Sequence, residues 1–143
     1  METSTILSLI AVLISLGSAG ISLWSLLRDR PRLQLHSHLA PANEYGPGQI
    51  TFKAVNKGRK PVVLRLFGGD YEGEALLGTY LGEKGAGLRL GESDFFEKTI
   101  MADNSMCMDL EGNFLIRVWV EDSTGRRYYF KKSTEQVKSL LQG

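Results

Sequence analysis

Two histidines and a sulfur-rich run are the residues whose types and spacing could bind a metal. His36 and His38 stand two positions apart in RLQLHSHLA, and this spacing puts both side chains on one face of a strand. Met106, Cys107 and Met108 form the run MCM, whose sulfurs are the soft ligands that Cu(I) prefers. One hypothesis is therefore a copper site built from these two segments.

A simpler interpretation of the same residues is structural, and we favour it. Polar side chains commonly cover strand surfaces, methionine and cysteine are common core residues, and nothing in the sequence brings the two segments together. Copper handling also suits the outside of a cell, whereas the charge pattern described below puts the domain inside. We expect no metal and no other cofactor, and we keep the copper site as the alternative.

The other reactive side chains form no catalytic motif. The run GEKGAGLRLGES resembles a glycine-rich phosphate loop, but its sequence continues as a strand and lacks the helix N-terminus that binds phosphate. The carboxylates of residues 70–74 and 92–97 have no apolar pocket that would fit them for acid–base work. Cys107 has no histidine near it in the sequence to activate its thiol. We therefore expect a protein that is not an enzyme.

Length and charge narrow the class of protein further. The chain has 143 residues, with 17 Lys and Arg against 16 Asp and Glu, a net charge of +1. This length suits one domain with an appendage. The near-zero net charge does not indicate nucleic-acid binding. A single cysteine cannot form an internal disulfide, which agrees with a reducing compartment or with a fold that needs no disulfide.

The appendage is an apolar N-terminal segment. After a tail of residues 1–4, residues 5–27 contain no charge and no proline. A helix of this length rises about 34 Å and can cross a hydrocarbon core of about 30 Å. The alternative is a cleaved signal peptide, which would need a basic start and a shorter apolar run, although GSAG resembles a weak cleavage site. We predict a transmembrane helix at 5–27.

Arginines set the direction of this helix. Arg28, Arg30 and Arg32 follow it in the exit segment 28–32, and no basic side chain precedes it. The positive-inside rule then puts the N-terminus outside and the C-terminal domain in the cytoplasm, in a single-pass protein of the inner (plasma) membrane. Trp24 is placed to anchor the helix at the headgroups.

Small side chains recur along the predicted helix every three or four residues, at Ser4, Ser8, Ala11, Ser15, Ser18, Ser22 and Ser25. At 100° per residue these seven positions, which we call the small-residue stripe, fall within about 100° of arc. Small residues mark contacts between helices in a bilayer, so we expect another transmembrane helix as partner, from the same or a different protein. The alternative is that each serine bonds back to the carbonyl four residues before it. Gly17 and Gly20 lie opposite and can form a second, smaller contact.

Alternating apolar and polar residues after the exit segment predict short strands. The strands are expected within 32–40, 49–58, 61–69, 74–82, 86–100 (two strands) and 113–132 (a hairpin around DSTG), with a helical turn or loop at 103–112. Their number and spacing predict a mainly β fold, an Ig-like antiparallel β-sandwich over 33–132. Ser133 and Gln136 form a capping box that predicts a short C-terminal helix over 133–143.

Basic residues cluster at two predicted hairpins, one with Lys53, Lys57, Arg59 and Lys60, the other with Arg126, Arg127, Lys131 and Lys132. With the exit arginines they can face anionic lipid. For these hairpins the sequence alone favours ordinary solvation.

Three runs, ITFKAVNKGRKPVVLRLFGG, LRLGESDFF and FLIRVWVEDSTGRRYYF, carry a resemblance to known proteins. They resemble small bacterial single-pass membrane proteins with an N-terminal transmembrane helix and an Ig-like β-sandwich, mostly of uncharacterised function. The resemblance implies the fold and carries over no active site. Together with the missing catalytic motifs, it leads us to expect a non-enzymatic accessory, assembly or scaffolding subunit of a membrane complex or homo-oligomer. The alternative is a membrane-anchored sensor of copper or a small ligand.

Overall fold

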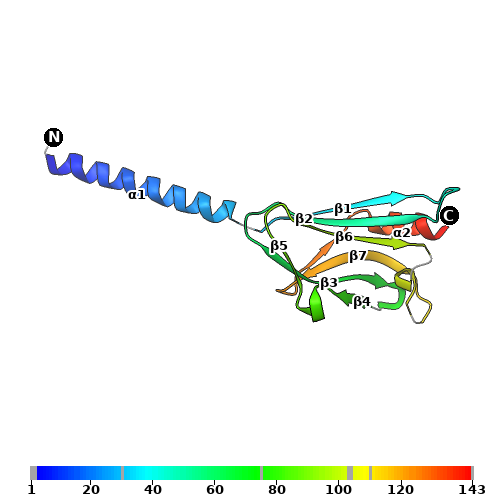
Figure 1. Ribbon diagram of the computed structural model, residues 1–143. Helices are drawn as coiled ribbons and strands as arrows, with labels where there is room; N and C mark the ends of the chain where they lie inside the picture. The colour runs from blue at the N-terminus through cyan, green and yellow to red at the C-terminus, as the bar shows by residue number, and fades with distance from the viewer. Residues whose placement is uncertain (1–2, 30, 75, 103–104, 110, 143) are drawn as a thin grey trace.

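The computed structural model describes residues 3–29, 31–74, 76–102, 105–109 and 111–142. A long helix leads into a β domain that ends in a short helix (Figure 1). The elements are α1 (Thr3–Arg28), β1 (Leu33–Ala40), β2 (Gln49–Asn56), β3 (Val62–Tyr71), β4 (Leu76–Tyr80), β5 (Leu88–Leu90), β6 (Phe95–Met101), β7 (Leu115–Asp122), β8 (Arg127–Tyr129) and α2 (Ser133–Gln142). Short 3-10 turns lie at η1 (Glu72–Glu74), η2 (Glu83–Gly85) and η3 (Ser105–Cys107).

The strands form two antiparallel sheets. One sheet has the order β1-β2-β6, and the other has the order β4-β3-β7-β8, with β5 also paired to β3. The chain crosses between the sheets from β2 to β3, from β5 to β6 and from β6 to β7, as in an immunoglobulin-like sandwich. The predicted architecture of an apolar N-terminal helix, two packed antiparallel sheets and a short C-terminal helix is therefore confirmed.

Alternating side chains of the strands form the core between the sheets. In β2, Ile50, Phe52 and Ala54 are fully buried while their neighbours are half-buried, because successive strand residues point to opposite faces. The ring of Phe52 meets that of Phe130 edge-on, with centroids 4.9 Å apart, and it is tilted against that of Phe67 at 6.0 Å. These rings join the two sheets across the core.

Helix α2 covers one side of the sandwich, and its first residue is anchored in an unexpected way. Val137 and Leu140 are buried against the core. The hydroxyl of Ser133 accepts the backbone N–H of Val118 at 3.1 Å and donates to the carbonyl of Phe130 at 2.7 Å. The side-chain amide of Gln136 donates to the carbonyl of Ser37 at 3.3 Å. The predicted capping box was therefore wrong, because these side chains bond to neighbouring strands and the β8–α2 connection.

Asn56, at the end of β2, fixes the turn that leads into β3. Its side chain is fully buried, and its amide donates to the carbonyls of Lys60 at 2.8 Å and Leu90 at 3.1 Å. Its oxygen accepts the backbone N–H of Gly58 at 3.0 Å. A buried amide that is bonded at both ends holds the 57–60 turn in one shape.

Candidate functional site

Helix α1 lies outside the folded domain. It offers a stretch of 25 residues, Thr3–Leu27, that is long and apolar enough to cross a membrane, and none of its most apolar window is buried by the rest of the protein. A membrane anchor and an N-terminal signal sequence both fit this description. The predicted apolar N-terminal helix is thus present, and its apolar side chains are exposed on its surface.

The seven positions of the small-residue stripe lie in α1. Four of its serines donate their hydroxyl hydrogen to the carbonyl four residues before: Ser8 to Ser4, Ser15 to Ala11, Ser18 to Ile14 and Ser22 to Ser18, at 2.9 to 3.0 Å. These hydroxyls are satisfied within the helix, so they need no partner as an acceptor. The small side chains of the stripe allow a second helix to approach closely, and the serine oxygens keep free lone pairs.

The predicted headgroup residues lie around the end of α1. Trp24 is 70% exposed on the helix surface. Arg32 is exposed, and its carbonyl accepts the backbone N–H of Lys57 at 2.7 Å, which joins the exit segment to the start of the sandwich. Arg30 and the side chain of Arg28 lie outside the described residues.

The two halves of the copper hypothesis lie on different sides of a sheet. His36 and His38 are exposed on β1, while the residues that alternate with them, Leu35 and Ser37, are half-buried. Cys107, in contrast, is 3% exposed, belongs to the core between the sheets, and its thiol donates to the carbonyl of Met101 at 3.2 Å.

The neighbours of Cys107 do not restore such a site. Met106 is half-buried, and its carbonyl accepts the hydroxyl of Tyr71 at 2.7 Å, whereas Met108 is 43% exposed. No group of three His, Cys, Asp or Glu side chains could hold a metal within the part of the chain that the structure describes. The structure does not bring the two histidines and the sulfurs together, because the histidines face solvent and the thiol faces the core.

The most elaborate side-chain cluster surrounds Trp119 on the outer face of the second sheet. Trp119 of β7 is 2% exposed, yet it lies outside the core between the sheets. Its register partner is Gly68 of β3, whose own partner on the other side is Gly78 of β4. A Cβ atom would lie 2.9 Å from the indole at Gly68 and 3.4 Å from it at Gly78. The two glycines therefore make the floor on which the indole lies.

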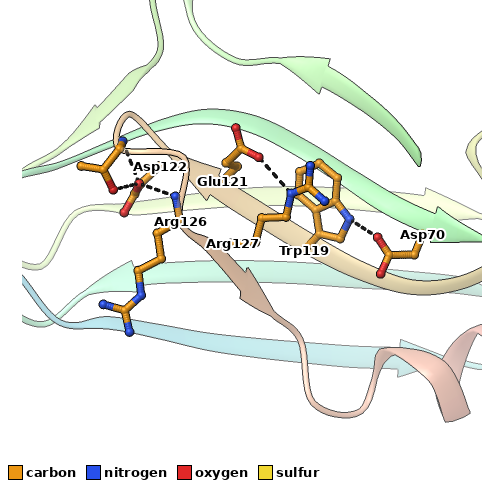
Figure 2. A network of polar contacts seen from close by, with 7 residues as sticks. Asp70, Trp119, Glu121, Asp122, Arg126 and Arg127 are labelled. Atoms are coloured by element: carbon orange, nitrogen blue, oxygen red, sulfur yellow. Dashed lines mark hydrogen bonds and ion pairs between the residues drawn. The ribbon is translucent and has the colours of Figure 1, made fainter. Parts of the chain in front are cut away.

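Charged groups cover the rest of the indole (Figure 2). Its N–H donates to Oδ1 of Asp70 at 2.8 Å, and the guanidinium of Arg127 lies over the ring at 4.3 Å from the centroid. Arg127 in turn donates to Glu121 at 2.9 Å, which raises the pKa of its guanidinium. Arg117 pairs with the other oxygen of Asp70 and lies over the ring of Tyr129. Each cation of this Trp119 cluster already has a carboxylate partner.

An open groove of about 640 Å³ runs beside the Trp119 cluster, between Asp70, Leu76, Ile116 and Tyr129. Its two arginines, Arg117 and Arg127, are held in the ion pairs just described. The charged side chains of this groove are therefore neutralised by ion pairs with one another, and these pairs stabilise the sheet. Sequence reasoning missed the Trp119 cluster, although glycine in the interior of a strand is a known sign of close approach by another group.

Asp122 builds the turn between β7 and β8. Its Oδ1 accepts the backbone N–H groups of Thr124 at 2.8 Å and Arg126 at 3.1 Å, and its Oδ2 accepts the hydroxyl of Tyr128 at 2.9 Å (Figure 2 shows the contact with Arg126). Burial by itself would raise the pKa of this carboxyl, but the hydrogen bonds from Thr124, Arg126 and Tyr128 outweigh burial and lower the pKa. The carboxylate is a structural part of the predicted hairpin turn.

Comparison with protein-family models and with curated proteins finds no match to this sequence. The features that bear on function are therefore those of the chain itself: an exposed apolar helix, a sandwich that follows it directly, and the charged turns where the two meet.

Proposed function

We propose that the chain is a single-pass membrane protein that acts without catalysis, as an accessory, assembly or scaffolding subunit of a membrane complex or homo-oligomer. The observation that carries the proposal is α1, whose apolar surface is left uncovered by the domain. Burying that surface in a bilayer is strongly favourable, since apolar area contributes about 25 cal/mol per Å² when it leaves water.

The start of the domain follows closely on the helix. Strand β1 begins at Leu33, only a few residues after α1 ends at Arg28. A chain of this length spans at most about 18 Å, so the sandwich stays beside the lipid surface. Such a module supplies one contact within the membrane through the small-residue stripe and a second contact near it through the domain. The arginines of the exit segment favour a cytoplasmic domain at the plasma membrane.

Membrane insertion is tested by alkaline carbonate extraction of membranes from cells that express the full chain. An integral protein stays in the pellet with its full length, whereas a cleaved signal sequence leaves a shorter, extractable product. The side of the domain is tested with Tyr45→Cys, because Tyr45 is 95% exposed and Cys107 is only 3% exposed. A membrane-impermeant maleimide is expected to label this cysteine only after the cells are opened.

The partner helix is tested by adding bulk to the small-residue stripe. Ser15→Leu combined with Ser18→Leu is expected to abolish self-crosslinking or co-purification of a partner, because leucine prevents close approach of the helices. The matched control is Gly17→Leu with Gly20→Leu, which adds bulk on the opposite face, where no atom lies within 4 Å. If association survives the serine changes and is lost with the glycine changes, the stripe is not the contact.

A further inference from the structure

Two basic turns, distant in the sequence, lie at the end of the sandwich from which α1 leaves. The first is the 57–60 turn between β2 and β3, joined to the exit segment by the hydrogen bond from Lys57 to Arg32. A hollow of about 270 Å³ lies between Arg59 of this turn, Trp24 of α1 and Asp29, which directly follows α1. Arg59 therefore faces the point where the helix would leave the bilayer.

The second turn, between β7 and β8, lies at the same end. The backbone N–H of Ser123 donates to the carbonyl of Val63 at 2.8 Å, and Val63 is the second residue of β3. Arg126 belongs to this turn, and Arg89 of β5 is the register partner of Val63. The fold thus brings Arg89 and Arg126 to the end that carries the 57–60 turn, which separation in the sequence had concealed.

The bases at this end are exposed and have no carboxylate partner among the residues that the structure describes. Ion pairs among the described residues join Lys53 to Glu97, Arg117 to Asp70 and Arg127 to Glu121, all on strands. None involves the six bases of the α1 end: Arg32, Lys57, Arg59, Lys60, Arg89 and Arg126. We call these six residues the basic end. Because none of them has an ionic partner among the described residues, their N–H donors can bind another anion.

Carboxylates at this end only partly offset the six bases. Asp29 lies at the end of α1, Glu92 lines a second hollow there with Arg59, and Asp94 is hydrogen-bonded to Asn56 through its backbone carbonyl. Asp122 is nearly buried and is used inside its own turn. Among the described side chains, six cations against three exposed or half-exposed carboxylates leave an excess of three positive charges.

We propose that the basic end is a docking surface for the headgroups of anionic phospholipids, which holds the sandwich upright on the bilayer that α1 crosses. The proposal rests on the membrane insertion proposed above. Anionic lipid is the partner that this position favours, because α1 keeps these six bases beside the headgroups. A negatively charged surface attracts basic groups that lie within a Debye length, about 8 Å at physiological salt.

The test measures how fast single lysines of the full chain are acylated in vesicles. The protein is reconstituted in phosphatidylcholine alone or with about 30% phosphatidylglycerol, treated with a neutral acetyl ester and read by mass spectrometry. Lys57 and Lys60 are expected to react several-fold more slowly with the anionic lipid, and high salt is expected to restore their rates. Lys132 and Lys138, placed just before and within α2, are expected to react equally in both lipids.

Two matched variants separate docking from mere nearness to a charged surface. R59Q/R126Q removes two charges from the basic end and is expected to abolish the lipid-dependent slowing at Lys57 and Lys60. K132Q/K138Q removes two charges elsewhere and is expected to leave that slowing intact. Because α1 keeps the 57–60 turn near the lipid in both variants, a non-specific surface effect would be the same in each.

The outcomes are distinct for the two proposals. Equal rates in both lipids, or slowing that persists in R59Q/R126Q, would overturn the docking surface if the protein resists carbonate extraction. Release of the full-length protein by carbonate would overturn the membrane insertion and the docking surface together. Both variants are expected to unfold thermally at the same midpoint temperature as the wild-type protein, which checks that the sandwich is intact.

Discussion

Trp119 lies on Gly68 across the outer face of the second sheet, and its N–H is bonded to Asp70 two residues further along β3. This pair places a large aromatic ring at a position where a strand normally exposes a polar side chain to solvent. Because a glycine lies beneath the ring and a guanidinium above it, the indole is buried without entering the main core. This second, small core makes the outer face of the sheet a rigid surface.

Replacing Trp119 by alanine is expected to destabilise the domain by about 3–5 kcal/mol, as for large buried aromatic residues in general. The change removes the contacts with Gly68 and the hydrogen bond to Asp70. Urea denaturation of the full chain in detergent, followed by circular dichroism, measures the free energy of unfolding. Arg117→Gln is the control and is expected to cost at most about 1 kcal/mol, because the side chain of Arg117 is 53% exposed. Equal losses for both variants would contradict a buried role for the indole.

Gly68→Ala tests the other half of the same relationship. The new Cβ would overlap the carbonyl oxygen of Leu77 and lie 2.9 Å from the indole. Because the first of these contacts is with backbone, relief requires β4 to shift, and we expect a loss at the upper end of the usual overpacking range of about 1–3 kcal/mol. Gly46→Ala is the matched control: nothing lies within 4 Å of its new Cβ, and a change within about 0.5 kcal/mol is expected. The same urea measurement compares the two.

The strands were predictable where one face of a strand is buried and the other is wet. In β2 the alternation of Ile50, Phe52 and Ala54 with half-buried neighbours is a local signal, so it can be read without knowing the partner strands. Helix α1 was predictable for a related reason, since an uninterrupted apolar run is itself the signal for a bilayer.

The Trp119 cluster was not predictable in the same way. The alternation along β7 points the side chain of Trp119 away from the core between the sheets. Its burial comes from Gly68 and Gly78, which are distant in sequence and become neighbours only through the register of three strands. The basic end has the same character, because the turn containing Arg126 joins the 57–60 turn only after the sheets have formed.

Ser133→Ala is expected to cost about 1–3 kcal/mol, since it leaves the buried N–H of Val118 without its acceptor. Gln136→Ala separates this role from the capping box that the sequence indicated. A capping box would make the two changes similar in cost, as each would remove half of it. The structure instead predicts a smaller loss for Gln136→Ala, because the change removes the long 3.3 Å bond to the carbonyl of Ser37 together with a buried Oε1 that has no hydrogen-bond partner among the described residues. Urea denaturation of both variants decides between the two arrangements.

Asp122→Asn is expected to lower stability at neutral pH by about 1.5–3 kcal/mol, the usual contribution of a hydrogen bond to a charged group. An amide can still accept from Thr124 and Arg126 through one oxygen, but its nitrogen cannot accept from the hydroxyl of Tyr128. Tyr128→Phe removes the same bond from the other side. In a double-mutant cycle, additive losses would show that the two groups do not interact.

The pH dependence of the Asp122 effect has a definite sign. The pKa of this carboxyl is lower in the folded protein than its ordinary value of 3.8, so the unfolded chain binds the proton more readily. The contribution of Asp122 to stability is therefore full above about pH 4 and is lost as the pH falls through the folded pKa. Asp122→Asn is expected to flatten the acid limb of the stability curve. An acid limb with unchanged slope would show that other carboxyls set it.

Tyr71→Phe tests a buried hydroxyl at the far end of β3. Burial raises the pKa of Tyr71 to about 12, and the nearby Cys107 and Asp109 add to the rise. Since this value exceeds the ordinary 10.0, its contribution is full below pH 10 and is lost as the pH rises toward 12. The variant is expected to lose about 0.5–1.5 kcal/mol at pH 7 with the bond to Met106, and its ultraviolet titration to lack one late-ionising tyrosine. Tyr45→Phe is the control, because Tyr45 is exposed. If the late-ionising tyrosine were missing from the titration of Tyr45→Phe, its assignment to Tyr71 would be wrong.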